Sequence, residues 1–308
     1  MLNLNKFKSK SSAYGDLFQR VVVHSLVLTF LVLLLYSSLF PLTSFALGFI
    51  TAICGAVGTY EYSSMAKVKM HYPLRMYSTL GSFLFIALSF LAIRLRHSLP
   101  EYSSALPWTV LIIWVVWSIF KVRKSEIGPL QLSGVTLFSI LYVGIPIRLF
   151  LHILYGFIDT QEPYLGIWWA SFLIATTKGA DIFGYFFGKA FGNKKITPQI
   201  SPNKTVIGFI AGCLGATLIS FIFFLQIPSR FMNYFPIPAI LIPLGLVLGI
   251  TGFFGDIIES MFKRDAHLKN SNKLKAVGGM LDTLDSLILS TPIVYLFLLI
   301  TQAKEFIR

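Results

Sequence analysis

Residues 255–286 read GDIIESMFKRDAHLKNSNKLKAVGGMLDTLDS and lie between two long apolar runs. Asp256 and Glu259 stand at the end of the first run, and Asp282 and Asp285 stand at the start of the second. Ionisable side chains at membrane depth are costly, so they usually mark a functional site. The loop between the two runs is rich in lysine and arginine. Carboxylates facing a basic loop at a bilayer surface indicate a site where metal ions meet phosphates.

The composition indicates a membrane protein. The chain has 308 residues, of which 55% are hydrophobic and 13% are charged, whereas an ordinary soluble domain has about 25% charged residues. Apolar runs long enough to span a bilayer recur along the chain. No polar stretch is long enough to form a soluble domain. We therefore predict an all-α polytopic membrane protein.

The apolar runs predict about nine transmembrane helices. The first run follows a basic segment and has no small-residue cleavage site of the kind that ends a signal peptide, so we expect it to be retained. Pro146 and Arg148 in the fifth run predict a break or a tilt there. The nine runs cover residues 21–40, 42–60, 77–93, 104–120, 131–156, 165–188, 206–226, 236–260 and 280–300.

The distribution of basic residues predicts the topology. With a cytoplasmic N-terminus, most of the 26 lysines and arginines lie on the cytoplasmic side, as the positive-inside rule requires. This topology explains the net charge of +13 without a nucleic-acid partner. We expect residues 1–20 to form a cytoplasmic segment, residues 21–160 the N-terminal transmembrane helices, and residues 161–308 a catalytic transmembrane region.

The carboxylates of the opening segment predict a metal site. Asp256, Ser260 and Lys263 share one helix face, and Asp282 and Asp285 share a face of the next helix. Oxygen ligands from two helices suit Mg²⁺, which prefers a few carboxylates together with substrate phosphate. Simple capping by Asp282 and solvation of the helix end at Asp256 are the plainer alternatives. We predict that Asp256, Asp282 and Asp285 bind the metal.

A second group of polar residues and glycines precedes residues 255–286 in the chain. Lys178 and Asp181 lie three residues apart in an apolar run and can form an ion pair. Three glycines follow at intervals of four residues, a spacing that allows helices to pack closely. These are Gly184, Gly188 and Gly192.

The loop after these glycines predicts phosphate contacts. Ser201, Lys204 and Thr205 supply two hydroxyls and an ammonium on a loop that Pro202 stiffens. Such groups suit phosphate or base contacts. The loop lacks the glycine spacing and the Gly-Lys-Ser/Thr ending of a Walker A motif, so it is a weak pattern by itself.

Taken together, these motifs resemble those of the phosphatidate cytidylyltransferases, or CDP-diacylglycerol synthases. Glu61-Tyr62 is similar to a shorter acidic-aromatic element of that family. The C-terminal motif is Ser260-x-x-Lys263-Arg264, then Lys269, then Gly278-Gly279-x-x-Asp282-x-x-Asp285. The upstream motif is Asp181-x-x-x-Tyr185-x-x-Gly188-Lys189-x-Phe191-Gly192, then Pro198 and Ile200-Ser201-Pro202-x-Lys204-Thr205-x-x-Gly208.

The chain departs from the family pattern at several positions. The family has an aspartate where this chain has Asn270, a histidine at Val277 and an arginine at Thr283. It has Trp-Glu where this chain has Val206-Ile207. The departures leave the effect on substrate and rate open, but they spare the carboxylates of both helices.

The resemblance implies transfer of the cytidylyl group of CTP to phosphatidate, giving CDP-diacylglycerol and pyrophosphate with one or two cations such as Mg²⁺. Asp181 is a further candidate, either orienting Lys204 or binding a second metal. The implied catalytic residues are Asp256, Lys263, Asp282 and Asp285. The implied substrate-binding residues are Ser201, Lys204, Thr205, Ser260, Arg264 and Lys269.

The same resemblance implies the location and the partners. We expect a multi-pass protein of a bacterial inner membrane with its active site on the cytoplasmic side. The expected partners are CTP, phosphatidate, other membrane lipids and a second copy of the chain in a homodimer.

Four other functions remain open from the sequence. A CTP-dependent lipid kinase, or a cytidylyltransferase for another lipid phosphate, would use the same groups. An ion-coupled transporter could bind ions at Asp181, Asp256 and Asp285, and a membrane scaffold would need no chemistry. The acidic residues gather toward one face of the membrane rather than at mid-span, which favours the enzyme.

Overall fold

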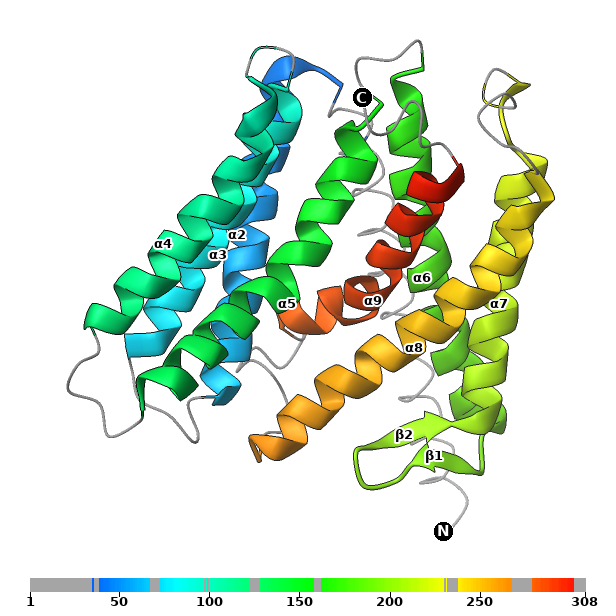
Figure 1. Ribbon diagram of the computed structural model, residues 1–308. Helices are drawn as coiled ribbons and strands as arrows, with labels where there is room; N and C mark the ends of the chain where they lie inside the picture. The colour runs from blue at the N-terminus through cyan, green and yellow to red at the C-terminus, as the bar shows by residue number, and fades with distance from the viewer. Residues whose placement is uncertain are drawn as a thin grey trace.

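The computed structural model is a bundle of long helices with one short β-hairpin (Figure 1). Its elements alternate in direction, so the hairpin and the C-terminal ends of α2, α4, α6 and α8 share the lower end in Figure 1. The structure describes residues 35, 39–66, 73–96, 98, 100–121, 128–157, 162–229, 231, 238–267 and 279–301.

The described residues form eight long helices. Short 3₁₀ segments, η1 (Glu101–Ala105) and η3 (Pro238–Ile240), precede α4 and α8, and the hairpin of β1 (Lys195–Thr197) and β2 (Ser201–Thr205) joins α6 to α7. The helices are α2 (Pro41–Ala66), α3 (Pro73–Arg94), α4 (Leu106–Lys121), α5 (Pro129–Tyr155), α6 (Tyr164–Phe191), α7 (Val206–Leu225), α8 (Leu241–Asp265) and α9 (Met280–Thr301).

The predicted class is confirmed. Seven of these helices are long and apolar enough to cross a membrane. The other long helix, α6, carries Lys178 and Asp181 in its apolar middle. The second to ninth predicted spans each correspond to one helix, while the segment 1–20 and nearly all of the first span, 21–40, lie outside the described residues.

Two details differ from the expectation. The fifth predicted span is a continuous helix, α5, so the break at Pro146 is not found, and the alternative of a tilt stays a prediction. The segment after α6, which was expected to be a loop, forms an antiparallel hairpin with Lys195 opposite Thr205. The hairpin matters because it holds the polar residues of that segment in extended backbone, with fixed side-chain directions.

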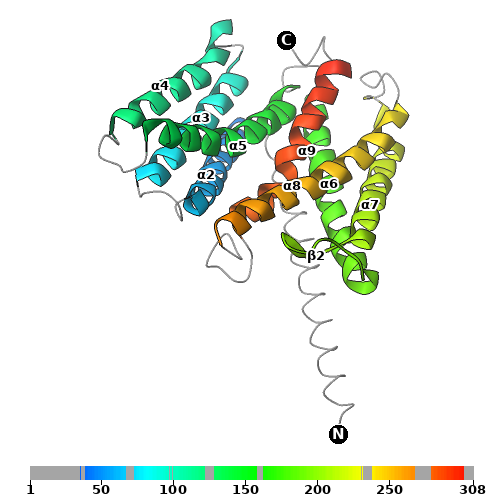
Figure 2. The ribbon, with the colours of Figure 1, turned by 60° about the horizontal axis from the view of Figure 1, so that its bottom comes forward.

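The helices form two groups that separate in both ribbon views (Figures 1 and 2). In the group α2–α5, one core surrounds the fully buried Phe85 and Ile140. In the group α6–α9, a second core surrounds Trp169 and Phe172. Helix α9 joins the groups, because it packs against both α2 and α5 as well as against α8.

Glycines set the closest helix contacts of the second group, as their spacing predicted. A Cβ atom on Gly184 would lie 3.1 Å from the backbone oxygen of Gly208, and one on Gly188 would lie 3.2 Å from its Cα atom. Helices α6 and α7 therefore touch along their backbones. At the crossing of α8 and α9, a Cβ atom on Gly255 would lie 2.3 Å from the carbonyl oxygen of Asp285.

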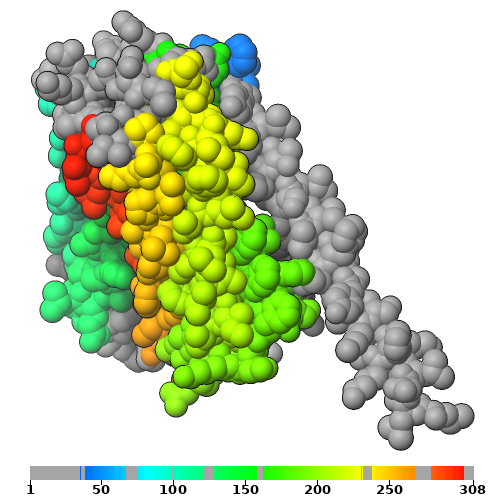
Figure 3. Space-filling model, turned by 90° about the vertical axis from the view of Figure 1, so that its right-hand side faces the viewer, coloured from blue at the N-terminus to red at the C-terminus, as the bar shows by residue number. Residues whose placement is uncertain are grey.

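The outer face of this group is apolar. Helix α7 covers much of the face seen in Figure 3, with α8 beside it. The exposed hydrophobic residues of α7 include Ile210, Leu214, Leu218 and Leu225. A helix that is apolar on its outer side as well as its inner side suits a lipid environment.

Candidate active site

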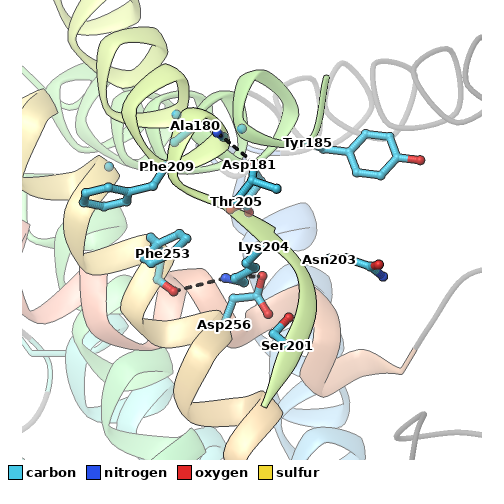
Figure 4. A pocket seen from close by; sticks show the side chains of 14 residues that line it. Ala180, Asp181, Tyr185, Ser201, Asn203, Lys204, Thr205, Phe209, Phe253 and Asp256 are labelled. Atoms are coloured by element: carbon cyan, nitrogen blue, oxygen red, sulfur yellow. Dashed lines mark hydrogen bonds and ion pairs between the residues drawn. The ribbon is translucent and has the colours of Figure 1, made fainter. Parts of the chain in front are cut away.

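A pocket opens between α6, β2, α7 and α8 near the hairpin end of the bundle (Figure 4). Asp181 and Tyr185 come from α6, and Phe253 and Asp256 come from α8. Strand β2 and the first turns of α7 complete the wall, and Gly184, Gly208 and Gly212 allow α6 and α7 to pack closely behind it. The residues of β2 that line the pocket are Ser201, Asn203, Lys204 and Thr205.

Lys204 is held firmly at this pocket. Figure 4 shows its ammonium between Asp256 and the backbone of Phe253. The Nζ atom lies 2.7 Å from Oδ2 of Asp256 and donates to the carbonyl oxygen of Phe253 at 3.2 Å. It also lies 4.3 Å from the centre of the Phe253 ring. A partly buried ammonium fixed in this way can attract phosphate oxygens without a large loss of side-chain entropy.

Three carboxylates gather beside the pocket. Asp256 and Glu259 of α8 and Asp285 of α9 each offer an oxygen atom, and these atoms lie within 4.8 Å of one another. Glu259 is 1% exposed, and its Oε1 atom has no hydrogen-bond partner within the described part of the chain. Glu259 and Asp285 are buried and Asp256 is half-buried, and buried carboxylates at this spacing are costly unless cationic groups neutralise them. The donor set is all oxygen, so it fits a hard divalent cation.

A second ammonium joins this cluster to the start of α9. The Nζ atom of Lys263 lies 2.6 Å from Oε2 of Glu259 and 2.5 Å from Oδ1 of Asp282. Asp282 also accepts a hydrogen bond from the backbone N–H of Gly279 at 2.8 Å. Asp282 therefore caps its own helix and orients Lys263 at the edge of the carboxylate cluster.

A third ammonium enters from α6. Lys178 lies 3.4 Å from Asp181, which confirms the predicted pair, and 3.7 Å from Asp285. It donates to the hydroxyl of Ser286 at 2.7 Å, and that hydroxyl donates in turn to Asp181 at 2.9 Å. Lys178 thus links α6 to α9 and neutralises charge beside the cluster.

Comparisons with known proteins agree with this geometry. The family model described as the cytidylyltransferase family matches residues 18–301. The chain belongs to the cytidylyltransferase family. It is 88% identical over 307 residues to a phosphatidate cytidylyltransferase of Chlamydia pneumoniae, with all of both chains covered. It is 57% identical to the protein of that name in Chlamydia trachomatis, covering 95% of this chain and 96% of the relative.

More distant relatives carry the same name. The phosphatidate cytidylyltransferase of Bacillus subtilis is 29% identical over 248 residues, which cover 79% of this chain and 85% of the relative. The family predicted from the two motifs is therefore confirmed. In this member of the cytidylyltransferase family, both motifs contribute residues to the same end of the bundle.

The structure distributes the predicted metal ligands over two places. Asp256 and Asp285 lie in the carboxylate cluster, whose third member is Glu259. Asp282, the other predicted ligand, contacts Lys263 beside the cluster. Lys204 is paired with Asp256, whereas Asp181, a candidate for orienting Lys204 or binding a second metal, is paired with Lys178.

The predicted substrate-binding residues also lie in different places. Ser201 and Lys204 line the pocket. Thr205 lines it too, but its hydroxyl accepts a hydrogen bond from Gly208 N–H at 3.1 Å and caps α7. Ser260 donates to Asp256 at 3.4 Å. Lys269 lies outside the described residues.

Arg264, the sixth predicted substrate-binding residue, contacts the hairpin. Its Nε atom donates to the carbonyl oxygen of Ile200 at 2.9 Å. Ile200 belongs to the turn between β1 and β2. The end of α8 is therefore attached to the tip of the hairpin that carries Lys204.

Sequence reasoning missed Glu259 as a member of the carboxylate cluster. Glu259 follows Asp256 by three residues, so the two share a helix face, and an acidic residue inside an apolar span is itself a signal. Lys178 was recognised only as a partner of Asp181. Its contact with Asp285 depends on how α6 and α9 pack, which local spacing does not reveal.

Proposed function

We propose that the chain transfers the cytidylyl group of CTP to phosphatidate and releases CDP-diacylglycerol and pyrophosphate. The observation that carries this proposal is the joining of the two motifs at one site, where Lys204 of β2 meets Asp256 of the carboxylate cluster at 2.7 Å. The relatives with this activity in their names cover nearly the whole chain. A nucleotide and a lipid phosphate both need cationic groups, and the site supplies them beside a membrane-embedded bundle.

Positioning is the main task of such a site. A lipid phosphate is already ionised, so its oxygen can attack the α-phosphorus of CTP without a strong base. A new bond forms between that oxygen and the α-phosphorus, and the bond to the bridging oxygen breaks as pyrophosphate leaves. Transfers of this kind are catalysed by placement and charge neutralisation. Lys204, Lys263 and Arg264 hold phosphate oxygens in this scheme.

Asp256, Glu259 and Asp285 are the residues that would hold a divalent cation, which we propose to be Mg²⁺. When bound, the cation neutralises phosphate oxygens and stabilises the leaving pyrophosphate. Ser260 supports Asp256, and Lys178 supports Asp285. The ligand role of Asp282 stays a prediction, which the substitution Asp282→Asn tests.

We also propose that the site faces the cytoplasm of a bacterium, at its inner membrane. The proposal is supported by the basic loops that the positive-inside rule assigns to that side and by the supply of CTP there. The residues that carry chemistry belong to the predicted catalytic region, 161–308. Phosphatidate would enter from the bilayer while its head group meets CTP at the hairpin end.

The experiment that tests the reaction uses two labels. Purified protein is incubated with phosphatidate and Mg²⁺ together with CTP labelled at either the α- or the γ-phosphate, and the lipid is extracted. We expect the α-label in the lipid fraction and the γ-label in pyrophosphate. A lipid kinase would instead place the γ-label in the lipid and release CDP, which would overturn the proposal.

A further inference from the structure

Glu61 of α2 binds the first turn of α9, more than two hundred residues away in the chain. Its Oε1 atom accepts a hydrogen bond from the backbone N–H of Met280 at 3.1 Å. Its Oε2 atom accepts one from the N–H of Leu281 at 2.8 Å. Glu61 is 4% exposed. A carboxylate of the N-terminal helix group therefore caps the last helix of the chain.

Both the start of α9 and the carboxylate of Glu61 need this contact. The first N–H groups of a helix have no partner within the helix, and leaving them buried without an acceptor is costly. A buried carboxylate is also costly unless donors surround it. The positive end of the helix dipole compensates the charge of Glu61, and both carboxylate oxygens are used. Few arrangements satisfy two consecutive N–H groups at once, so the contact restricts the depth and the rotation of α9.

Residues next to Glu61 in α2 also contact α9 and α8, so they restrict the position of α8 as well. One turn before Glu61, a Cβ atom on Gly58 would lie 3.5 Å from Leu284, so α2 and α9 approach closely there. The next residue, Tyr62, has its ring centre 5.1 Å from that of Phe262 in α8. The same turn of α2 thus contacts both helices that carry the carboxylate cluster.

We propose that Glu61 is a positioning residue, which sets the placement of Asp282 and Asp285 by capping α9 from α2. Asp282 follows the capped residue Leu281 directly, and Asp285 lies one turn further along. A change in the depth or rotation of α9 would move both carboxylates relative to Asp256 and Glu259 of α8. The inference rests on the site roles proposed above for these carboxylates.

The test compares Glu61→Gln with Thr59→Val. Glutamine has nearly the same shape but presents an NH₂ group to one of the two N–H donors. Thr59 is a matched control: it is buried on the same helix, and its hydroxyl bonds to Ser82 of α3 at 2.9 Å, away from α9. Mn²⁺ binding to the purified protein without substrate is measured by electron paramagnetic resonance, together with the Mg²⁺ concentration that gives the half-maximal rate.

We expect Glu61→Gln to weaken Mn²⁺ binding and to raise the Mg²⁺ requirement by about tenfold or more, as loss of an outer-shell contact does at other metal sites. Thr59→Val is expected to change neither. Wild-type Mn²⁺ binding in Glu61→Gln would overturn the proposal. Equal weakening in both variants would also overturn it, because the effect would then be a general loosening of α2.

A second variant removes a donor instead of the acceptor. Met280→Pro lacks one N–H that Glu61 accepts, and proline is tolerated at the first position of a helix. We expect a shift in the same direction, and less than the summed effect when it is combined with Glu61→Gln. Fully additive effects would contradict a shared contact. Asp256→Asn serves as a separate check: unchanged Mn²⁺ binding there would refute the metal cluster itself rather than the role of Glu61.

Discussion

The two helix groups handle polar side chains inside the membrane in different ways. In α5, the hydroxyls of Thr136 and Ser139 donate to carbonyl oxygens one turn earlier in their own helix, at 2.8 and 2.6 Å. In the group α6–α9, Lys204 pairs with a carboxylate of α8, and Lys263 pairs with one of α9. Hydrogen bonds also join helices of the first group, such as that of Thr59 with Ser82, but in the second group the elements are joined by pairs of opposite charge.

This difference bears on why the candidate site lies in the group α6–α9. A hydroxyl that bonds to its own helix is satisfied wherever that helix lies, so it specifies little about the packing. A buried ammonium or carboxylate needs a partner of opposite charge, and that partner must arrive from another element. The ion pairs of α6–α9 therefore fix the positions of these elements relative to one another. Mutations of polar residues should consequently have different effects in the two groups.

The largest expected effect is on turnover. Asp256→Asn removes a carboxylate from the cluster and leaves Lys204 without its 2.7 Å partner. We expect the rate of cytidylyl transfer to fall about 100-fold or more, while the protein still elutes as a folded species in detergent. Thr136→Val in α5 is the control, and its rate should match the wild type. Similar losses in both variants would remove the contrast between the groups.

A second prediction concerns helix spacing and compares two glycines. Gly255→Ala places a Cβ atom against the carbonyl oxygen of Asp285, whereas Gly134 of α5 has nothing within 4 Å of such an atom. We expect Gly255→Ala to lower the free energy of unfolding by about 1–3 kcal/mol. Gly134→Ala should raise it by about 0.5–1 kcal/mol, because alanine favours helix. Thermal unfolding in detergent measures both, and equal shifts would contradict the close crossing of α8 and α9.

A third prediction concerns the buried ammonium of α6. Lys178→Met leaves Asp181, Asp285 and the hydroxyl of Ser286 without a cation between them. We expect a loss of about 1–3 kcal/mol in the free energy of unfolding. Lys195→Met, on the exposed side of β1, should change it by less than about 0.5 kcal/mol. Indistinguishable melting temperatures for the two variants would show that Lys178 does not stabilise the α6–α9 contact.

The smallest expected effect separates two roles of Arg264. Arg264→Gln and Arg264→Lys both remove the Nε donor to Ile200, and lysine keeps the positive charge. We expect both to speed proteolysis of the hairpin modestly, since one exposed hydrogen bond contributes about 0.5–1.5 kcal/mol. Only Arg264→Gln should raise the concentration of CTP needed for half-maximal rate. A raised requirement in Arg264→Lys as well would assign the effect to the hairpin contact alone.

Much of the fold follows from the sequence alone. Apolar runs of sufficient length predicted the second to ninth spans, because hydrocarbon requires helices whose backbone groups are satisfied internally. The spacing of Gly184 and Gly188 predicted close helix packing, because a missing side chain has a direct steric effect, and the structure shows that the partner is α7. The hairpin was missed because its strands of three and five residues are too short for a periodic pattern.

Residues of the candidate site can be singled out from the sequence more readily than the contacts between them. Asp256 and Asp285 were identified because charge inside an apolar run is conspicuous. The pairing of Lys204 with Asp256, and of Lys263 with Asp282, depends on how three elements meet in space. The sequence predicted Asp282 beside Asp256 and Asp285, whereas the carboxylate cluster of the structure contains Glu259 in its place. Both residues lie on suitable helix faces, and only the crossing of α8 and α9 distinguishes them.

The cap of α9 by Glu61 has a consequence for biosynthesis. Synthesis runs from the N-terminus, and the earlier helices can fold while the later ones are still being made. Helix α9 is synthesised after α2, and its first turn must find an acceptor already present on α2. The carboxylate cluster is thus completed only after α9 has been inserted, and a nascent chain that stops before residue 280 would lack the two N–H donors that α9 offers to Glu61.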